Sequence, residues 1–285
     1  MKVVSGDNFC DLSKYKLYRT VYDVLHPTIS KKNISNYKVV FEEKLLPTLI
    51  FYPKRVSNIK SVIIMVPGNG VVNNSYGKYS NICKRMAIET EKLVIAIDYF
   101  NGKIKYPTTV NKVYKVISYL CEELEKNGIN SSSITLMSDS TGCGILNHCL
   151  YKLKKKDKKI GKMIMFYPVG RNDYTDFTWD ENYLNVNFNL DKKINNYLKK
   201  YYVNDSHEVC NLLESEKFDG FPNTLIVTGD MDIFKYDGQL LGEGFSKNID
   251  GSKYVNIKFA CHGFLSSADE DVKMEAYKVI EEFVL

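Results

Sequence analysis

Short apolar runs of strand length alternate along this chain with longer stretches whose apolar residues recur at helical spacing. Strands are expected over 38–41, 48–52, 62–66, 93–97, 134–137, 163–167, 225–228 and 255–259. Helices are expected over 78–89, 108–125, 141–153, 238–248 and 269–283. Strands that alternate with helices in this way predict an α/β fold with a mostly parallel, doubly wound sheet.

A single domain is the simplest organisation for this pattern. The chain has 285 residues, which is ordinary for one α/β unit, and no repeat or low-complexity linker divides it. Two segments fall outside the alternation, 1–36 at the front and the polar, aromatic-rich stretch 171–218. We therefore expect one domain over 1–285 with two additional pieces attached to it.

The segment 134–144 carries the most informative chemistry. An apolar strand runs into a turn with Ser140 at its apex, and small residues follow. This is the layout of a nucleophile elbow, in which a sharp turn exposes a serine hydroxyl to a base and to backbone N–H groups. The usual pattern is Gly-x-Ser-x-Gly, and Ser138 replaces its first glycine here. An alternative is that Ser140 simply caps the helix 141–153.

A serine nucleophile needs a general base and a group that orients it. The chain has four histidines, and only His262 directly follows a predicted strand, in a loop that could carry a base. We expect structural or solvent-facing roles for the other three, His26, His148 and His207.

The orienting acid should lie in the loop after the preceding strand. That loop offers three candidates, Asp230, Asp232 and Asp237. With any of them the chain order is Ser, Asp, His, the order of the α/β hydrolases and not of the other two serine-hydrolase arrangements.

On these residues the chain resembles the hormone-sensitive-lipase-like branch of the α/β hydrolases, which includes arylacetamide deacetylases and bacterial acetyl esterases. The similar motifs are Asp98-Tyr99, Tyr106-Pro107, Tyr167-Pro168, Asp232 to Gly238 and His262-Gly263-Phe264. The resemblance implies that Asp232 is the acid, with Asp230 in reserve, and that Asp237 caps the helix starting near Gly238. It also implies that 1–36 and 171–218 form a small helical cap over the active site.

The same resemblance places an oxyanion hole after the strand 62–66. The family carries His-Gly-Gly-Gly there, whereas this chain has Pro67-Gly68-Asn69-Gly70. By the family pattern the backbone N–H groups of Asn69, Gly70 and Thr141 would form the hole. Because the hole works through backbone N–H groups, the changed side chains matter only if the backbone cannot adopt the needed shape.

Other functions are less well supported by the sequence. The glycines after residue 66 lack the spacing of a dinucleotide fingerprint or a phosphate loop. The net charge is +5, but we expect the basic run 152–159 to face solvent, without a nucleic-acid-binding motif. Seven cysteines without a CxxC pair argue against zinc and a disulfide framework, so we expect no cofactor or metal and a reducing, cytoplasmic compartment.

The expected function is therefore hydrolysis of small to medium acyl esters by a serine carboxylesterase. Ser140 would be the nucleophile, His262 the base and Asp232 the acid. Two alternatives stay open: an amidase, formamidase or deacetylase with the same residues, and an inactive relative that binds a ligand without catalysis. The sequence separates neither ester from amide nor one acyl length from another.

Overall fold

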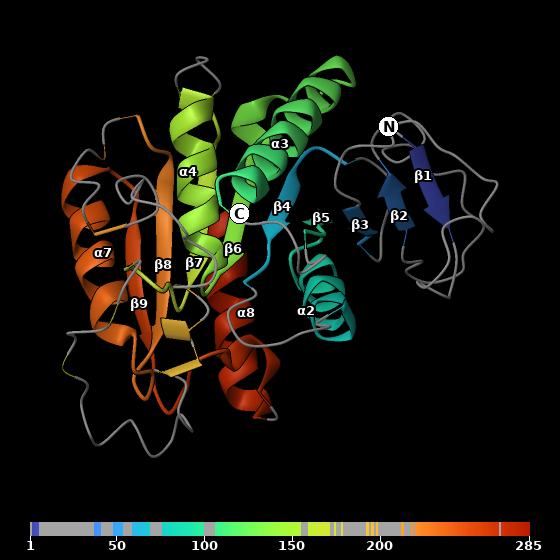
Figure 1. Ribbon diagram of the computed structural model, residues 1–285. Coiled ribbons are helices and arrows are strands. Elements are labelled where there is room, and N and C mark those ends of the chain that lie inside the picture. The colour runs from blue at the N-terminus through green and yellow to red at the C-terminus, as the bar shows by residue number, and fades with distance from the viewer. Residues whose placement is uncertain are drawn as a thin grey trace.

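The computed structural model places the helices and strands in one layered arrangement (Figure 1). The structure describes residues 2–5, 37–40, 48–53, 59–68, 76–99, 106–154, 159–171, 174, 178, 192–193, 195–196, 198, 212–213, 218, 220–267 and 269–285. Most of the expected cap pieces 1–36 and 171–218 therefore lie outside the described residues, as do Asn69 and Gly70.

Within these residues a nine-stranded sheet forms the centre of the fold, with the order β1-β2-β3-β5-β4-β6-β7-β8-β9. The strands are β1 Lys2–Ser5, β2 Tyr37–Val40, β3 Thr48–Phe51, β4 Val62–Val66, β5 Leu93–Ile97, β6 Ile134–Asp139, β7 Lys162–Phe166, β8 Asn223–Gly229 and β9 Lys253–Ile257. Pairing is antiparallel from β1 to β5 and parallel from β5 to β9. The predicted mostly parallel sheet is confirmed, and β1 is an addition that the pattern did not predict.

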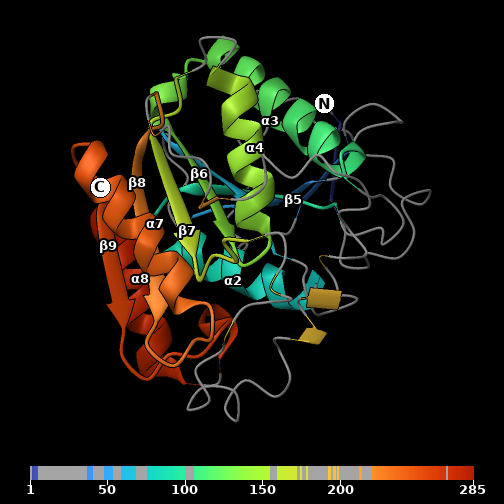
Figure 2. The ribbon, with the colours of Figure 1, turned by 60° about the vertical axis from the view of Figure 1, so that its left-hand side comes forward.

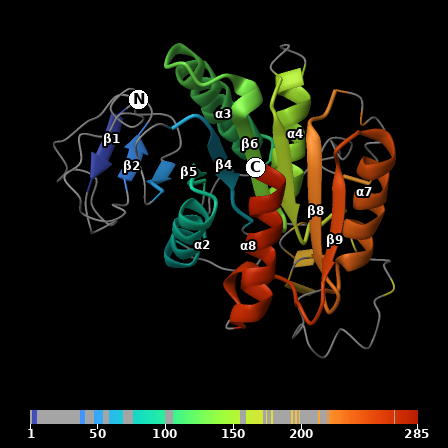
Figure 3. The ribbon, with the colours of Figure 1, turned by 180° about the vertical axis from the view of Figure 1, so that it is seen from behind.

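Helices cover both faces of this sheet (Figure 2). They are α2 Tyr76–Glu89, α3 Thr108–Lys126, α4 Gly142–Lys154, α7 Lys235–Asn248 and α8 Glu270–Val284, with short 3-10 turns η2 Ser131–Ser133 and η4 Phe264–Ser266. Apolar residues of α3, α4 and α7 belong to one core, and those of α2 and α8 to the other. Seen from behind, α8 lies in front of the sheet (Figure 3).

Alternation along β4 shows how the sequence builds two cores at once. Val62, Ile64 and Val66 face the α3, α4 and α7 side, whereas Ile63 and Met65 face α2 and α8. All five are fully buried. Successive side chains of a strand point to opposite faces, so a parallel strand covered on both sides must be apolar throughout. This is why the central strands read as continuous apolar runs.

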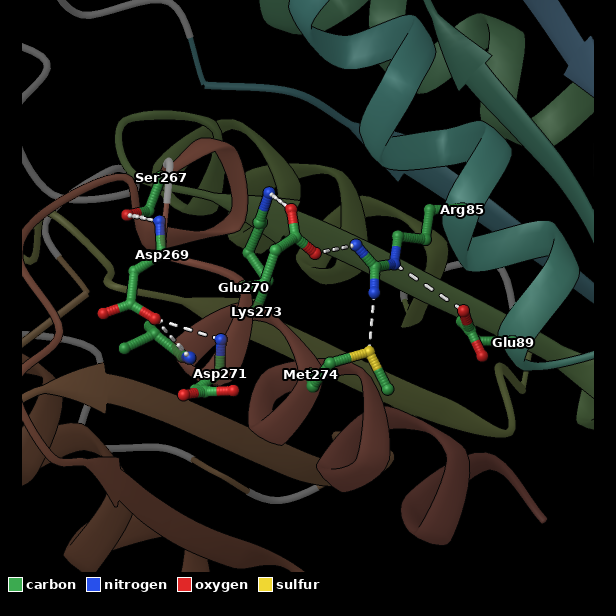
Figure 4. Close-up of polar contacts among 9 residues, drawn as sticks. Arg85, Glu89, Ser267, Asp269, Glu270, Asp271, Lys273 and Met274 are labelled. Atoms are coloured by element: carbon green, nitrogen blue, oxygen red, sulfur yellow. Dashed lines mark hydrogen bonds and ion pairs between the residues drawn. The ribbon is translucent and has the colours of Figure 1, made fainter.

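Contacts between α2 and α8 close the second layer (Figure 4). Arg85 lies 2.6 Å from Glu270 and 3.6 Å from Glu89, and its guanidinium stands 5.1 Å from the ring centre of Tyr277. The Asp269 carboxylate caps α8 by accepting hydrogen bonds from the backbone N–H groups of Asp271 and Val272, at 3.0 and 3.2 Å. Glu270 is largely exposed, so its ion pair contributes little to holding α2 and α8 together, whereas the cap stabilises the start of α8 itself.

Several element boundaries differ from the sequence prediction by a few residues, and two of the differences concern residues near the site. Helix α7 begins at Lys235, three residues before the expected start at Gly238, so Asp237 lies inside its first turn and does not cap it. Strand β9 ends at Ile257, before Phe259, whose φ of +59° cannot continue a strand. Propensity does not locate such ends, because tertiary contacts decide them.

The expectation that the basic run 152–159 faces solvent is met in part. Lys154 and Lys159 of the basic run are exposed, but the Lys152 ammonium lies 5.5 Å from the ring centre of Tyr114 and hydrogen-bonds Asn111. The described cysteines are free thiols. No helix in the described part of the chain is long and apolar enough to cross a membrane.

His148 is a buried histidine on α4. It is 7% exposed, neither ring nitrogen has a hydrogen-bond partner, and the ring meets Tyr106 edge-on with centres 6.0 Å apart. Burial, assisted by the positive charge of Lys152, lowers its pKa to about 4. Because the unfolded chain takes up a proton near pH 6.5 and the folded chain does not, this residue makes the protein less stable as the pH falls from 6.5 to 4.

Replacing His148 with phenylalanine should flatten this pH dependence. The variant His148→Phe keeps an aromatic ring beside Tyr106 but cannot take up a proton when unfolded. Between pH 7 and pH 5 the free energy of unfolding of the natural protein should fall by up to about 2 kcal/mol more than that of the variant. Urea unfolding of both proteins at the two pH values measures the difference. An equal change in the free energy of unfolding between pH 7 and pH 5 in the two proteins would contradict the burial of an uncharged ring.

Candidate active site

Ser140 occupies a tight turn between β6 and α4. Its φ is +50°, a value that residues other than glycine rarely adopt, and its N–H donates to the Phe166 carbonyl at 2.9 Å. The turn is closed because Gly142 packs on the end of β4, where an added Cβ would lie 2.6 Å from the Val66 carbonyl oxygen. A helix-capping residue has extended backbone angles, so the geometry of Ser140 is that of an elbow and not of a cap.

Ser138 stands where the usual elbow pattern has its first glycine, and its small side chain fits beneath the turn. Ser138 is fully buried, and its hydroxyl donates to the Cys143 sulfur at 3.3 Å. The Cys143 thiol in turn points to the Phe166 carbonyl at 3.8 Å, and burial raises its pKa above the usual value. The thiol therefore stays protonated and acts as a packing and donor group beneath the turn.

His262 lies against Ser140. The serine Oγ is 2.8 Å from Nε2 of the imidazole, and Nδ1 is 2.9 Å from Oδ2 of Asp232. Asp232 is fully buried, and its other carboxylate oxygen accepts from the Phe234 N–H at 2.9 Å. With the Nδ1 proton directed to the carboxylate, Nε2 is left as the acceptor for the serine proton.

Two aromatic rings hold the imidazole in place. Tyr167 and Phe234 each meet His262 edge-on, with ring centres 5.0 Å away. The His262 side chain is only 8% exposed, so its hydrogen bonds lie in a largely water-free environment. The sequence analysis did not select either ring, although Phe234 stands two residues after Asp232 and Tyr167 belongs to a quoted family motif.

The reserve aspartate does not contact the histidine. The backbone N–H of Asp230 donates to the Ile257 carbonyl at 3.0 Å, and its backbone carbonyl accepts from the Lys235 ammonium at 3.1 Å. Its Oδ1 is buried without a hydrogen-bond partner. Of the other histidines, His148 lies within α4, and His26 and His207 fall outside the described residues. The described residues contain no group of three or more His, Cys, Asp or Glu side chains that could hold a metal ion.

The Asp237 carboxylate is held by a separate network of hydrogen bonds and an ion pair. Its carboxylate is 3.0 Å from Nε of Arg171 and accepts from the Tyr174 hydroxyl at 2.5 Å. That hydroxyl also accepts the N–H groups of Gly170 and Arg171 at 3.1 and 3.2 Å. Burial raises the pKa of Asp237, while Tyr174 and Arg171 oppose the rise. The network ties the segment after β7 to the first turn of α7.

The expected oxyanion donors are only partly described. Thr141 follows Ser140 directly, is 5% exposed, and precedes the first residue of α4, where backbone N–H groups and the helix dipole favour negative charge. Asn69 and Gly70 lie outside the described residues. Gly68, just before them, packs so closely on the elbow that an added Cβ would lie 2.8 Å from the Ser140 Cβ.

A doubly wound sheet with a serine turn after one strand and a histidine and an aspartate after two others defines an α/β hydrolase. A family model described as the alpha/beta hydrolase fold matches residues 63–266. The chain belongs to this family, the hormone-sensitive-lipase-like α/β hydrolases that its motifs resemble.

Among curated proteins it is similar to vegetative-specific protein H5 of Dictyostelium discoideum, with 22% identity over 87% of this chain and 78% of that protein. Among solved structures it is similar to carboxyl esterase 2 of the fungus Tuber melanosporum, with a TM-score of 0.74, 18% identity, and coverage of 93% of this chain and 96% of that one. It is also similar to the thermostable carboxylesterase EstE1 from a metagenomic library, with a TM-score of 0.70, 17% identity, and coverage of 93% and 92%.

Removing the cation from the Asp237 network should destabilise the fold in a pH-dependent way. In Arg171→Met the buried carboxylate loses its ion pair, and we expect a loss of about 1–3 kcal/mol at pH 7. The raised pKa of Asp237 allows protonation as the pH falls, so the loss should shrink near pH 4. Urea unfolding at both pH values measures it.

Arg85→Met is the matched control, because it removes an arginine of similar exposure whose partner, Glu270, is 61% exposed. Its loss should stay within about 1 kcal/mol. Equal losses in the two variants would show that burial of the Asp237 carboxylate has no consequence for stability.

Proposed function

We propose that this protein is a serine carboxylic ester hydrolase in which Ser140, His262 and Asp232 act as the catalytic triad. One observation carries the proposal: an unbroken hydrogen-bonded series runs from the serine hydroxyl through the imidazole to a buried carboxylate, at 2.8 and 2.9 Å. The backbone of Ser140 supports it, since a positive φ in a turn between a strand and a helix is the geometry of a nucleophile elbow.

In the first half-reaction the Ser140 oxygen attacks the acyl carbon while Nε2 of His262 takes its proton. The imidazolium that forms is stabilised by the Asp232 carboxylate at Nδ1. The tetrahedral intermediate then collapses, the bond to the leaving alcohol breaks, and His262 gives the alcohol its proton. In the second half-reaction His262 takes a proton from water as the water oxygen attacks the acyl carbon. The bond to the Ser140 oxygen then breaks, His262 returns the proton to Ser140, and the acid leaves.

Negative charge develops on the substrate oxygen in both half-reactions. We assign the N–H groups of Thr141, Asn69 and Gly70 to its stabilisation, on the family pattern and on the position of Thr141 beside the nucleophile. Removing one such donor from a serine hydrolase costs about a hundredfold or more in rate.

Esters of small to medium acyl chains are the substrates that we propose. The fungal carboxyl esterase 2 and the metagenomic carboxylesterase share this fold over more than nine-tenths of the chain, which favours an ester over an amide. An inactive binding protein has no physical need of three side chains held at hydrogen-bonding distance, so the geometry favours an enzyme. The assay below distinguishes all three functions.

Hydrolysis of a p-nitrophenyl ester series from acetate to palmitate should show turnover with the short and medium chains. A fluorophosphonate probe should label the natural protein and not Ser140→Ala, because the probe reacts only with an activated serine. The exposed-serine variant Ser132→Ala should be labelled and active like the natural protein. Labelling without ester turnover would direct the search to amides. The absence of both labelling and turnover in a folded protein would refute the proposal that the protein is an enzyme.

The assignment of the acid has its own matched pair of variants. Asp232→Asn should lower kcat on the order of ten-thousandfold, because an amide cannot stabilise the imidazolium or hold its tautomer. Asp230→Asn, two residues away and out of contact with His262, should change kcat by no more than a few fold. Steady-state kinetics on the best ester decide, and a deeper loss in Asp230→Asn would make the assignment of Asp232 wrong.

A further inference from the structure

Side chains hold every backbone hydrogen-bonding group of Pro67 and Gly68. The Tyr99 hydroxyl donates to the Pro67 carbonyl, and proline has no N–H. The Gly68 N–H donates to Oδ1 of Asp139 at 2.7 Å, and the Tyr79 hydroxyl donates to the Gly68 carbonyl. These two residues lead directly into the segment to which the oxyanion donors Asn69 and Gly70 are assigned.

The three side chains come from different parts of the fold. Tyr79 lies on α2, Tyr99 follows β5, and Asp139 is the last residue of β6, next to the nucleophile. All three are at most 7% exposed. The end of β4 is therefore fixed from three directions within a packed interior, where hydrogen bonds are strong and costly to break.

Asp139 is a buried carboxylate that the proposed reaction does not use. Besides the Gly68 N–H it lies 3.1 Å from the Tyr79 hydroxyl, and the Tyr167 hydroxyl also hydrogen-bonds it. Burial, with the charge of Asp139 as a second cause, raises the pKa of Tyr79 and of Tyr167. Both hydroxyls therefore stay protonated and serve as donors to the carboxylate or the neighbouring carbonyl.

Close packing leaves no room for a side chain at Gly68. An added Cβ would lie 2.4 Å from the Asp139 carbonyl oxygen, so this stretch of chain rests on the elbow itself. The Gly68 carbonyl also belongs to the same planar peptide unit as the N–H of the following residue. A hydrogen bond that fixes this carbonyl therefore fixes the plane in which that N–H lies.

We propose that Tyr79, Tyr99 and Asp139 are positioning residues that align the oxyanion loop with the nucleophile. The inference rests on the proposed ester hydrolysis. The three residues touch no reacting atom and act through the backbone of Pro67 and Gly68, so their contribution is to orientation and not to proton transfer. Misplacing an oxyanion donor by a fraction of an ångström lowers the rate of acyl transfer.

Hydrogen exchange tests the structural part without any substrate. In Tyr79→Phe and Tyr99→Phe, deuterium uptake of the proteolytic peptide that contains Gly68 should rise, while that of peptides from α3 and β9 stays unchanged. Tyr277→Phe, which removes a hydroxyl from another buried tyrosine, should leave the Gly68 peptide as in the natural protein. Unchanged uptake in both test variants would overturn the inference, whether or not the protein hydrolyses esters.

Kinetics test the positioning part. Tyr79→Phe should lower kcat for the best ester by about tenfold with little change in KM, and should weaken binding of a boronate transition-state analogue by a similar factor. A purely structural role would leave the affinity for the boronate unchanged. Asp139→Asn keeps an oxygen that can accept from Gly68, so it should retain more activity than Asp139→Ala.

The outcomes separate this inference from the proposed function. Raised exchange with unaltered kcat and boronate affinity would overturn the positioning role while ester hydrolysis stands. Raised exchange in the two tyrosine variants, together with no ester hydrolysis by the natural protein, would support the hold of these side chains on Pro67 and Gly68 and refute the proposed function.

Discussion

Lack of space around the turn at Ser140 is the constraint on which the site depends. Gly142 and Gly68 sit where an added Cβ would press on backbone atoms, at 2.6 and 2.4 Å. The turn can close only because these residues have no side chain, and closure brings the Ser140 backbone onto the carbonyl of Phe166. The parallel register from β6 through β7 and β8 to β9 then sets the height of the serine relative to the loops of the aspartate and the histidine.

Asp139, Asp232 and Asp237 are buried carboxylates at or after the C-terminal ends of strands, and the fold satisfies each differently. Asp232 receives an imidazole and a backbone N–H, Asp139 receives a glycine N–H and tyrosine hydroxyls, and Asp237 receives a guanidinium and a tyrosine hydroxyl. A buried charge without partners would be prohibitive, so each carboxylate fixes the geometry of the groups around it. Only Asp232 is directed at a residue that can carry a proton to a substrate.

Much of this arrangement could be predicted from the sequence, for identifiable reasons. The central strands are apolar at every position because both faces are covered, and the residues that the spacing selected, Ser140 and His262, lie 2.8 Å apart. The predicted start of α7 near Gly238 and the predicted capping role of Asp237 were wrong. The partners of Asp237 come from a segment more than sixty residues earlier, which local sequence does not reveal. The hydrogen bonds of Tyr79 and Tyr99 were not predicted, although Tyr99 belongs to a motif that resembles the family, because a tyrosine in a helix or after a strand gives no sign of the carbonyl that it will meet. The oxyanion donors Asn69 and Gly70 stay a prediction.

The two helix layers of this protein have separate cores that meet at the nucleophile. Ser140 is continuous with α4 on one face of the sheet, whereas Tyr79, which holds the neighbouring Gly68, belongs to α2 on the other. The surroundings of Ser140 are therefore complete only when the helices on both faces of the sheet are in place, and a change in the packing of α2 can reach the serine although α2 and α4 lie on opposite faces.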